Sequence, residues 1–211
     1  MEPGSPASRV TMASPLKNEP VVFSQMLEAL IVHALSGKLD ATAMRRIEAA
    51  GIDLSQTLMV AYPLTVWYDV VQVCSELLFP GQPRTEALYG IGKRVAHGYS
   101  HTTMGKALFA NLKVQGWQRA IGSLARALRT GGNFLAAHSN ELPSGDIEVV
   151  VEILPEFHPA LGSHPGIDPN FMRGFLDAAA ELIRGAQSPT FKLTAVDVAA
   201  RRATFLVHEH A

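Results

Sequence analysis

The sequence predicts an α+β fold in which an N-terminal helical half, residues 21–130, precedes a small antiparallel sheet half, residues 131–208, with the order strand–strand–helix–strand–strand. Two changes of pattern lead to this prediction. Up to about residue 130, apolar residues recur every three or four positions, whereas beyond Gly131-Gly132 they alternate. The chain has 211 residues, 47% of them apolar and 18% charged, which is enough for one domain with a substantial core.

Residues 1–20 are predicted to form a disordered tail. They contain four prolines, one glycine and three serines, and few apolar residues. Burial of so little apolar surface cannot offset the entropy lost on ordering the segment. The single α+β domain is therefore expected to begin at residue 21 and to end near residue 208.

The helical period predicts helices over residues 21–36, 41–50, 63–79 and 83–97. Residues 103–129 resemble one long helix, but the phase of their apolar positions changes along the segment. Met104 and Leu108 share one face, whereas Ile121 and Leu124 fall on the side that lysines occupy earlier. Because a straight helix cannot bury both faces, we expect a break near Gly116.

The sheet half begins with strands expected over residues 133–142 and 146–153, joined by the turn Pro143-Ser144-Gly145. Asp168 and Pro169 supply an N-cap and a first-turn proline for a helix that ends at Gly185. Two further strands are expected over residues 190–198 and 203–207. Strands that follow one another through short turns favour antiparallel pairing.

The cysteine content and the apolar runs bear on location. Cys74, the one cysteine, sits on an apolar helical face and is predicted to be a core thiol, so the chain can form no internal disulfide. No apolar run reaches the length of a membrane span, and the N-terminus lacks the pattern of a signal peptide. We therefore expect a cytoplasmic protein.

Histidine offers the only candidates for a metal-assisted enzyme. His97 and His101 are four residues apart, as two metal ligands on one helical face would be. Gly98 between them argues against a helix at this point, and no third ligand can be named from the sequence. No catalytic residues are predicted, because the sequence has no Gly-x-Ser-x-Gly elbow and no Cys-x-x-Cys motif.

Charge is strongly segregated along the chain. Residues 87–140 contain no acidic residue and seven basic ones, Lys93, Arg94, Lys106, Lys113, Arg119, Arg126 and Arg129, whereas residues 141–181 contain eight acidic residues and one arginine. We expect the two segments to neutralise each other within the molecule or across a homodimer. The alternative is an anion- or nucleic-acid-binding regulator that uses Lys93, Arg94, Lys106, Arg126 and Arg129.

The favoured interpretation is a non-catalytic binding module, a sensor or adaptor for a small apolar ligand or a protein partner. Large apolar residues are abundant, and no set of reactive groups is assembled. The predicted ligand-binding residues are Trp67, Tyr68, Tyr89, Tyr99 and Trp117. No cofactor is expected.

Several short motifs carry a family resemblance. They are Pro80-Gly81-Gln82-Pro83, Gly92-Lys93-Arg94, Gly105-Lys106-Ala107-Leu108 and Arg129-Thr130-Gly131-Gly132-Asn133-Phe134. On these residues the chain resembles a paralogous family of small myxobacterial proteins of unknown function over about residues 20–207. The resemblance implies a shared fold rather than a reaction.

The order of elements is also similar, more distantly, to nitric-oxide-sensing haem domains, vinyl-reductase-type ligand-binding domains and the tethering subunits of vesicle transport. This similarity implies a pocket or a dimer face between the helices and the sheet. The haem sensors hold their cofactor with a Tyr-x-Ser-x-Arg pattern, and Tyr99-Ser100-His101 does not match it. Haem is therefore not expected, although His97 and His101 remain candidates for an axial ligand.

Overall fold

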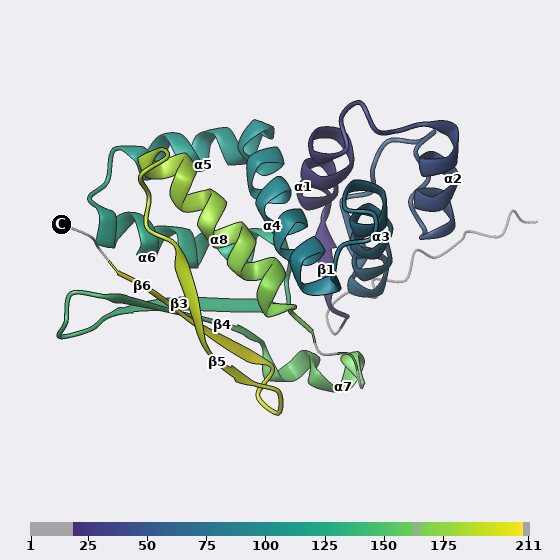
Figure 1. Ribbon diagram of the computed structural model, residues 1–211. Helices are drawn as coiled ribbons and strands as arrows, with labels where there is room; N and C mark the ends of the chain where they lie inside the picture. Colours follow the sequence, from purple (N-terminus) through teal and green to yellow (C-terminus); the bar gives the residue numbers. More distant parts are fainter. Residues whose placement is uncertain (1–18, 163, 165, 209–211) are drawn as a thin grey trace, which may run out of the picture.

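The computed structural model describes residues 19–162, 164 and 166–208, and Figure 1 shows helices packed on one face of a four-stranded sheet. The α+β class is as predicted, and the sheet half has its predicted order of two strands, one long helix and two strands. The predicted disordered tail lies outside the described residues except for Glu19 and Pro20. The helical half comprises β1 (Val21–Phe23), α1 (Ser24–Leu27), the π-helix η1 (Glu28–Ala34), α2 (Ala41–Ala49), β2 (Ala61–Pro63), α3 (Leu64–Leu78), α4 (Arg84–His101), α5 (Thr103–Lys113), α6 (Trp117–Ala127) and the 3-10 helix η2 (Leu128–Gly131).

The sheet half comprises β3 (Leu135–Glu141), β4 (Ile147–Ile153), the 3-10 helix η3 (Pro155–Phe157), α7 (His158–Leu161), α8 (Pro169–Arg184), β5 (Phe191–Asp197) and β6 (Arg202–Val207). The strands pair antiparallel in the order β3-β4-β6-β5. Ile147, Val149, Val151 and Ile153 of β4 are buried against the helices, as the alternation predicts. Asp168 caps α8 as expected, because its Oδ1 accepts the backbone N–H groups of Asn170 and Phe171 at 2.8 and 3.3 Å.

The prediction of a helix from residue 21 was wrong at its start. Val21–Phe23 forms a strand that pairs antiparallel with Ala61–Pro63. β-Branched and aromatic residues favour an extended strand when a partner is present, and this partner lies about forty residues further along the chain. The rest of the predicted segment is helical and continues through the π-helical turn η1 to Ala34.

The helix through His97 was predicted to end too early. α4 continues to His101, so His97 and His101 do share a helical face. Gly98 does not end the helix. A Cβ at Gly98 would lie 2.1 Å from the carbonyl oxygen of Ala29, so glycine is needed for η1 to pack against α4.

Close backbone contact at glycines also joins the two halves of the fold, where α4 packs against α8. A Cβ at Gly92 would lie 2.0 Å from the carbonyl oxygen of Phe171, and a Cβ at Gly174 would lie 2.0 Å from that of Tyr89. Each glycine thus lets the backbone of the other helix approach closely.

The break expected near Gly116 is confirmed. α5 ends at Lys113 and α6 begins at Trp117, and each helix buries its own apolar face. Among the helices that the structure describes, none has both the length and the apolar character needed to cross a membrane.

Candidate functional site

An apolar cavity lies where the two halves of the fold meet, and we call it the interhelical cavity. Its volume is about 130 Å³, and α3, α4, α8, η2 and the segment before α8 supply most of its walls. Trp67, Leu88, Phe134 and Phe171 are among the lining residues. The rings of Trp67 and Phe171 meet edge to face with their centroids 5.9 Å apart. A cavity of this size and lining is comparable to an engineered cavity of about 150 Å³ that stays dry and binds benzene.

Tyr68 carries a polar group of this lining that is left unpaired. Within the described residues its hydroxyl is buried and has no hydrogen-bond partner. Burial raises the pKa of Tyr68 well above its usual value, although the charge of Arg201 opposes the shift. The hydroxyl therefore stays protonated near neutral pH and can donate a hydrogen bond. Leaving such a group buried and unpaired costs about 1–3 kcal/mol.

His164 covers the ring of Tyr68. The two rings are stacked with their centroids 3.7 Å apart and their planes 12° apart. Burial, followed by the charges of Arg201 and Arg84, lowers the pKa of His164. Arg201, in the turn between β5 and β6, donates hydrogen bonds to the carbonyl oxygens of Gly162 and His164. The imidazole is therefore a neutral aromatic cover at neutral pH.

The remaining polar groups of the lining include Gln72 and Arg84, both of them exposed. Nη1 of Arg84 donates to Oε1 of Gln72 at 3.3 Å. On the inner side, the hydroxyls of Tyr99 and Thr130 lie 3.3 Å apart and pair with each other. The interhelical cavity thus combines an apolar interior, one unpaired hydroxyl and a polar rim, which are the usual features of a small-molecule site.

The structure brings three of the five predicted ligand-binding aromatics together. Trp67, Tyr68 and Tyr99 line the interhelical cavity, whereas Tyr89 and Trp117 do not. Tyr89 donates to Oδ2 of Asp177 at 2.8 Å. Trp117 lies beneath the guanidinium of Arg184, whose central carbon is 4.4 Å from the ring centroid.

Asp177 was not singled out from the sequence. It is 3% exposed on α8, and its Oδ1 accepts the backbone N–H of Phe191 at 2.6 Å. Burial raises the pKa of Asp177 in spite of these hydrogen bonds. The only signal in the sequence was an acidic residue on the apolar face of a helix. The carboxylate ties α4, α8 and β5 together, which is a structural role.

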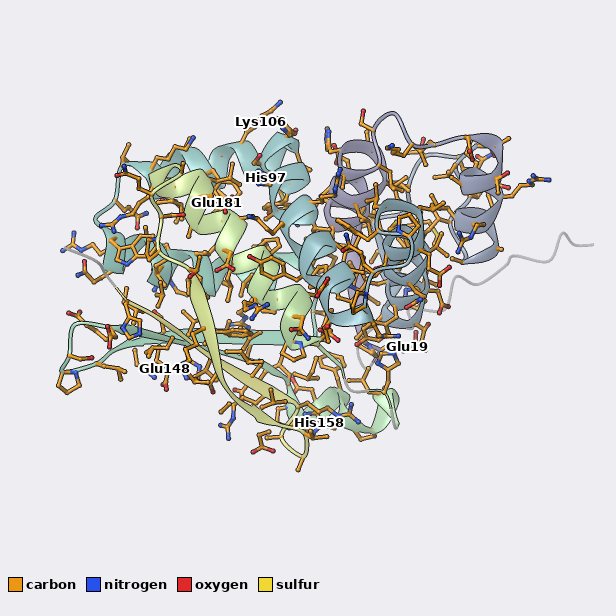
Figure 2. All side chains as sticks on the ribbon, in the orientation of Figure 1. Glu19, His97, Lys106, Glu148, His158 and Glu181 are labelled. Atoms are coloured by element: carbon orange, nitrogen blue, oxygen red, sulfur yellow. The ribbon has the colours of Figure 1, made fainter. Side chains whose placement is uncertain are left out.

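His97 and His101 lie apart from the interhelical cavity. Nε2 of His97 lies 3.8 Å from Oε2 of Glu181, and Figure 2 shows these two side chains near each other where α4 meets α8. His101 packs against His33 with the ring centroids 5.5 Å apart. Burial lowers the pKa of His97. In the part of the chain that the structure describes, no three histidine, cysteine or acidic side chains are grouped as metal ligands would be.

The seven cations of the basic segment have different surroundings. Lys93 forms an ion pair of 2.7 Å with Glu181, and Arg94 donates to the carbonyl oxygen of Ala34. Lys106, Lys113, Arg119, Arg126 and Arg129 are exposed. Over the described residues, none of these five forms an ion pair with an acidic side chain. Within the described residues, Lys93 is therefore the only one of the seven cations that pairs with an acidic side chain of residues 141–181.

Cys74 is fully buried, and burial raises the pKa of its thiol to about 12. A nucleophilic cysteine needs its thiolate, so this environment agrees with a core thiol.

Three solved structures are similar to this chain in fold. An H-NOX protein from S. oneidensis in its Fe(II)NO ligation state aligns with a TM-score of 0.58 at 12% identity, over 88% of this chain and 98% of that one. The unliganded Fe(II) H-NOX protein from K. algicida aligns with a TM-score of 0.52 at 11% identity, over 89% of this chain and 96% of that one. A third structure, described by the modulation of heme redox potential through porphyrin distortion, aligns with a TM-score of 0.61 at 8% identity, over 88% and 97% of the two chains. At these identities the likeness establishes the fold alone.

The interhelical cavity does not fit a haem. Its volume of about 130 Å³ matches a benzene ring, and a porphyrin is several times larger. Of the histidines that the structure describes, only His164 lines the cavity, and its ring lies flat against Tyr68. His97 and His101, the axial candidates from the sequence, are not part of the lining.

By sequence, the model of one protein family, described as a protein of unknown function (DUF2378), matches residues 20–207. No curated protein matches the chain.

Proposed function

The chain belongs to the DUF2378 family of proteins of unknown function, and we propose that it is a non-catalytic binding module that holds a small, largely apolar ligand in the interhelical cavity. One observation carries the proposal, which is the buried, unpaired hydroxyl of Tyr68 in a mainly apolar lining. A ligand with one hydrogen-bond acceptor would satisfy this donor, and its apolar remainder would fill the space beside Trp67 and Phe171.

The form of the site supports a sensor or adaptor rather than a catalyst. The lining offers a protonated phenol and a neutral imidazole, and the lone thiol is buried elsewhere. The cavity lies where α3, α4 and α8 meet, and α4 and α8 are locked together by backbone contacts at Gly92 and Gly174. A ligand that fills the cavity would therefore stiffen the joint between the two halves, and a partner protein could detect that change.

Three accompanying proposals concern the location of the protein, its cofactor and its partner. A single buried thiol is compatible with the reducing cytoplasm, where we place the protein. We infer that the ligand is not haem, because the cavity is too small for a porphyrin. A protein partner or a second copy of the chain is the expected recipient of the signal, and light scattering of the purified protein reports whether it is a dimer.

The experiment compares two probes of similar size, toluene and anisole, of which only anisole has a hydrogen-bond acceptor. Binding is followed from the NMR shifts of cavity methyl groups. We expect wild-type protein to prefer anisole by roughly two- to tenfold, the range for one neutral hydrogen bond. Tyr68→Phe removes the preference but keeps toluene binding.

Val71→Phe is the occlusion variant for this experiment. Val71 lines the cavity and is buried, so a phenyl group there takes up the free space, and both probes should bind much more weakly. The proposal fails if wild-type protein binds neither probe. It also fails if Val71→Phe binds both as well as wild type.

A further inference from the structure

A second concave site lies on the surface and shares no lining residue with the interhelical cavity. We call it the α6–β3 groove, and it is lined by Arg119, Gly122, Ser123 and Arg126 of α6 and by Ser139 and Glu141 of β3. Its volume is about 390 Å³. Most of its lining residues have polar side chains, and two of the seven cations of the basic segment are among them.

The two arginines are placed to act on one ligand. Arg119 and Arg126 are seven residues apart on α6, which brings them to the same helical face two turns apart. In the described structure neither is paired with a carboxylate, in contrast to Lys93, which Glu181 neutralises. Two unneutralised guanidinium groups on one concave face favour a bound anion.

The hydroxyl of Ser123 holds the guanidinium of Arg126 in place. Nη2 of Arg126 donates to Oγ of Ser123 at 3.0 Å, and that hydroxyl donates to Oε1 of Gln115 at 3.0 Å. The chain of hydrogen bonds continues from Nε2 of Gln115 to Oδ1 of Asn111 on α5. Arg126 is therefore partly ordered before any ligand arrives, which reduces the entropy lost on binding.

Gly122 keeps the floor of the groove open between the two arginines. A Cβ at this position would lie 3.3 Å from Oγ of Ser139 and 3.7 Å from Nη1 of Arg126. Glycine in the middle of a helix costs about 1 kcal/mol relative to alanine. Gly122 is thus a residue of low helix propensity at a position where a methyl group would crowd Ser139 and Arg126 in the groove.

We propose that the α6–β3 groove binds the phosphoryl group of a small organic phosphate through the guanidinium groups of Arg119 and Arg126, with the hydroxyl of Ser139 as a further donor. Guanidinium groups pair with phosphate oxygens through parallel hydrogen bonds. Glu141 also lines the groove, and its register partner Ile147 stands between Asp146 and Glu148, which add negative charge at this end of the β3–β4 hairpin. That charge opposes an extended polyanion, so a single phosphoryl group is favoured over a nucleic-acid strand.

The test uses phenyl phosphate as the probe, with binding followed by NMR shifts of α6 amides at low salt. We expect Arg119→Gln and Arg126→Gln each to weaken binding by about tenfold, as for loss of a hydrogen bond to a charged group. Lys106→Gln is the matched control, because Lys106 is an exposed cation of the same basic segment, on α5 and outside the groove. It should change the affinity by less than about twofold, the size of a screened long-range effect.

Gly122→Ala separates occupation of the groove from charge. It leaves every cation in place but puts a methyl group 3.3 Å from Oγ of Ser139, so it should weaken phenyl phosphate binding several-fold. The proposal is overturned if wild-type protein does not bind the probe, or if Lys106→Gln weakens binding as much as the arginine variants. It is also overturned if a single-stranded oligonucleotide binds through the same arginines more tightly than phenyl phosphate does. Tyr68→Phe should not affect this binding.

Discussion

Replacing Tyr68 by phenylalanine should make the protein more stable while impairing its proposed function. The substitution removes one hydroxyl and leaves the ring stacked on His164, with centroids 3.7 Å apart in the wild-type protein. That hydroxyl is buried without a hydrogen-bond partner in the described structure. The folded protein therefore bears a desolvation cost that the unfolded chain, in water, does not.

The size of the effect follows from that cost. An unsatisfied buried hydroxyl costs about 1–3 kcal/mol, and we take the lower end because the cavity has a polar rim. In a chain of this length 1 kcal/mol shifts Tm by roughly 2–4 °C. Differential scanning calorimetry of the ligand-free protein should therefore show Tm higher by a few degrees in Tyr68→Phe than in wild type.

Tyr99→Phe is the matched control, because Tyr99 lines the same cavity but its hydroxyl is paired with that of Thr130 at 3.3 Å. Removing a paired hydroxyl costs about 0.5–1.5 kcal/mol, so this variant should have a lower Tm than wild type. If Tyr68→Phe lowers Tm as much as Tyr99→Phe does, the Tyr68 hydroxyl is already satisfied. The reasoning behind the proposed ligand would then be refuted.

Four further substitutions test the fold. Gly92→Ala places a Cβ 2.0 Å from a backbone oxygen of α8 and should cost about 3 kcal/mol or more by urea denaturation. Gly116→Ala meets no atom within 4 Å and should cost much less, namely the preference of an N-cap for glycine over alanine. Asp168→Ala removes the cap of α8 and should cost about 1 kcal/mol, and an unchanged Tm would contradict the capping role. Burial raises the pKa of Asp177, so its carboxylate destabilises the fold increasingly as the pH rises from about 4 through its folded pKa. Asp177→Asn should gain stability over wild type across that pH range, and a constant difference between about pH 4 and pH 7 would contradict the shift.

Local patterns predicted most elements because each of those elements satisfies its own apolar period. The break at Gly116 is an example, since the change of phase is visible within one segment. The strand at Val21 was missed because its partner, β2, lies some forty residues away. Gly98 was read as a helix breaker because its reason for being glycine is the carbonyl of Ala29 on another helix.

The candidate site shows the same limit. Composition and helical spacing identified Trp67, Tyr68 and Tyr99 as aromatic residues that could line a cavity. They could not separate these residues from Tyr89, because that separation depends on Asp177, which lies 88 positions further along the chain. The unpaired Tyr68 hydroxyl is likewise invisible in the sequence, since it follows from which elements pack around one atom.

The most direct test of the central claim is native mass spectrometry, with an absorbance spectrum, on wild-type and Val71→Phe protein as isolated from cells. Wild-type protein should carry the added mass of a small ligand bound in the interhelical cavity, and this mass should be lost on denaturation. Val71→Phe should lack the added mass. Neither protein should show a Soret band. The bare chain mass in both proteins, or a haem mass with a Soret band, would contradict the account.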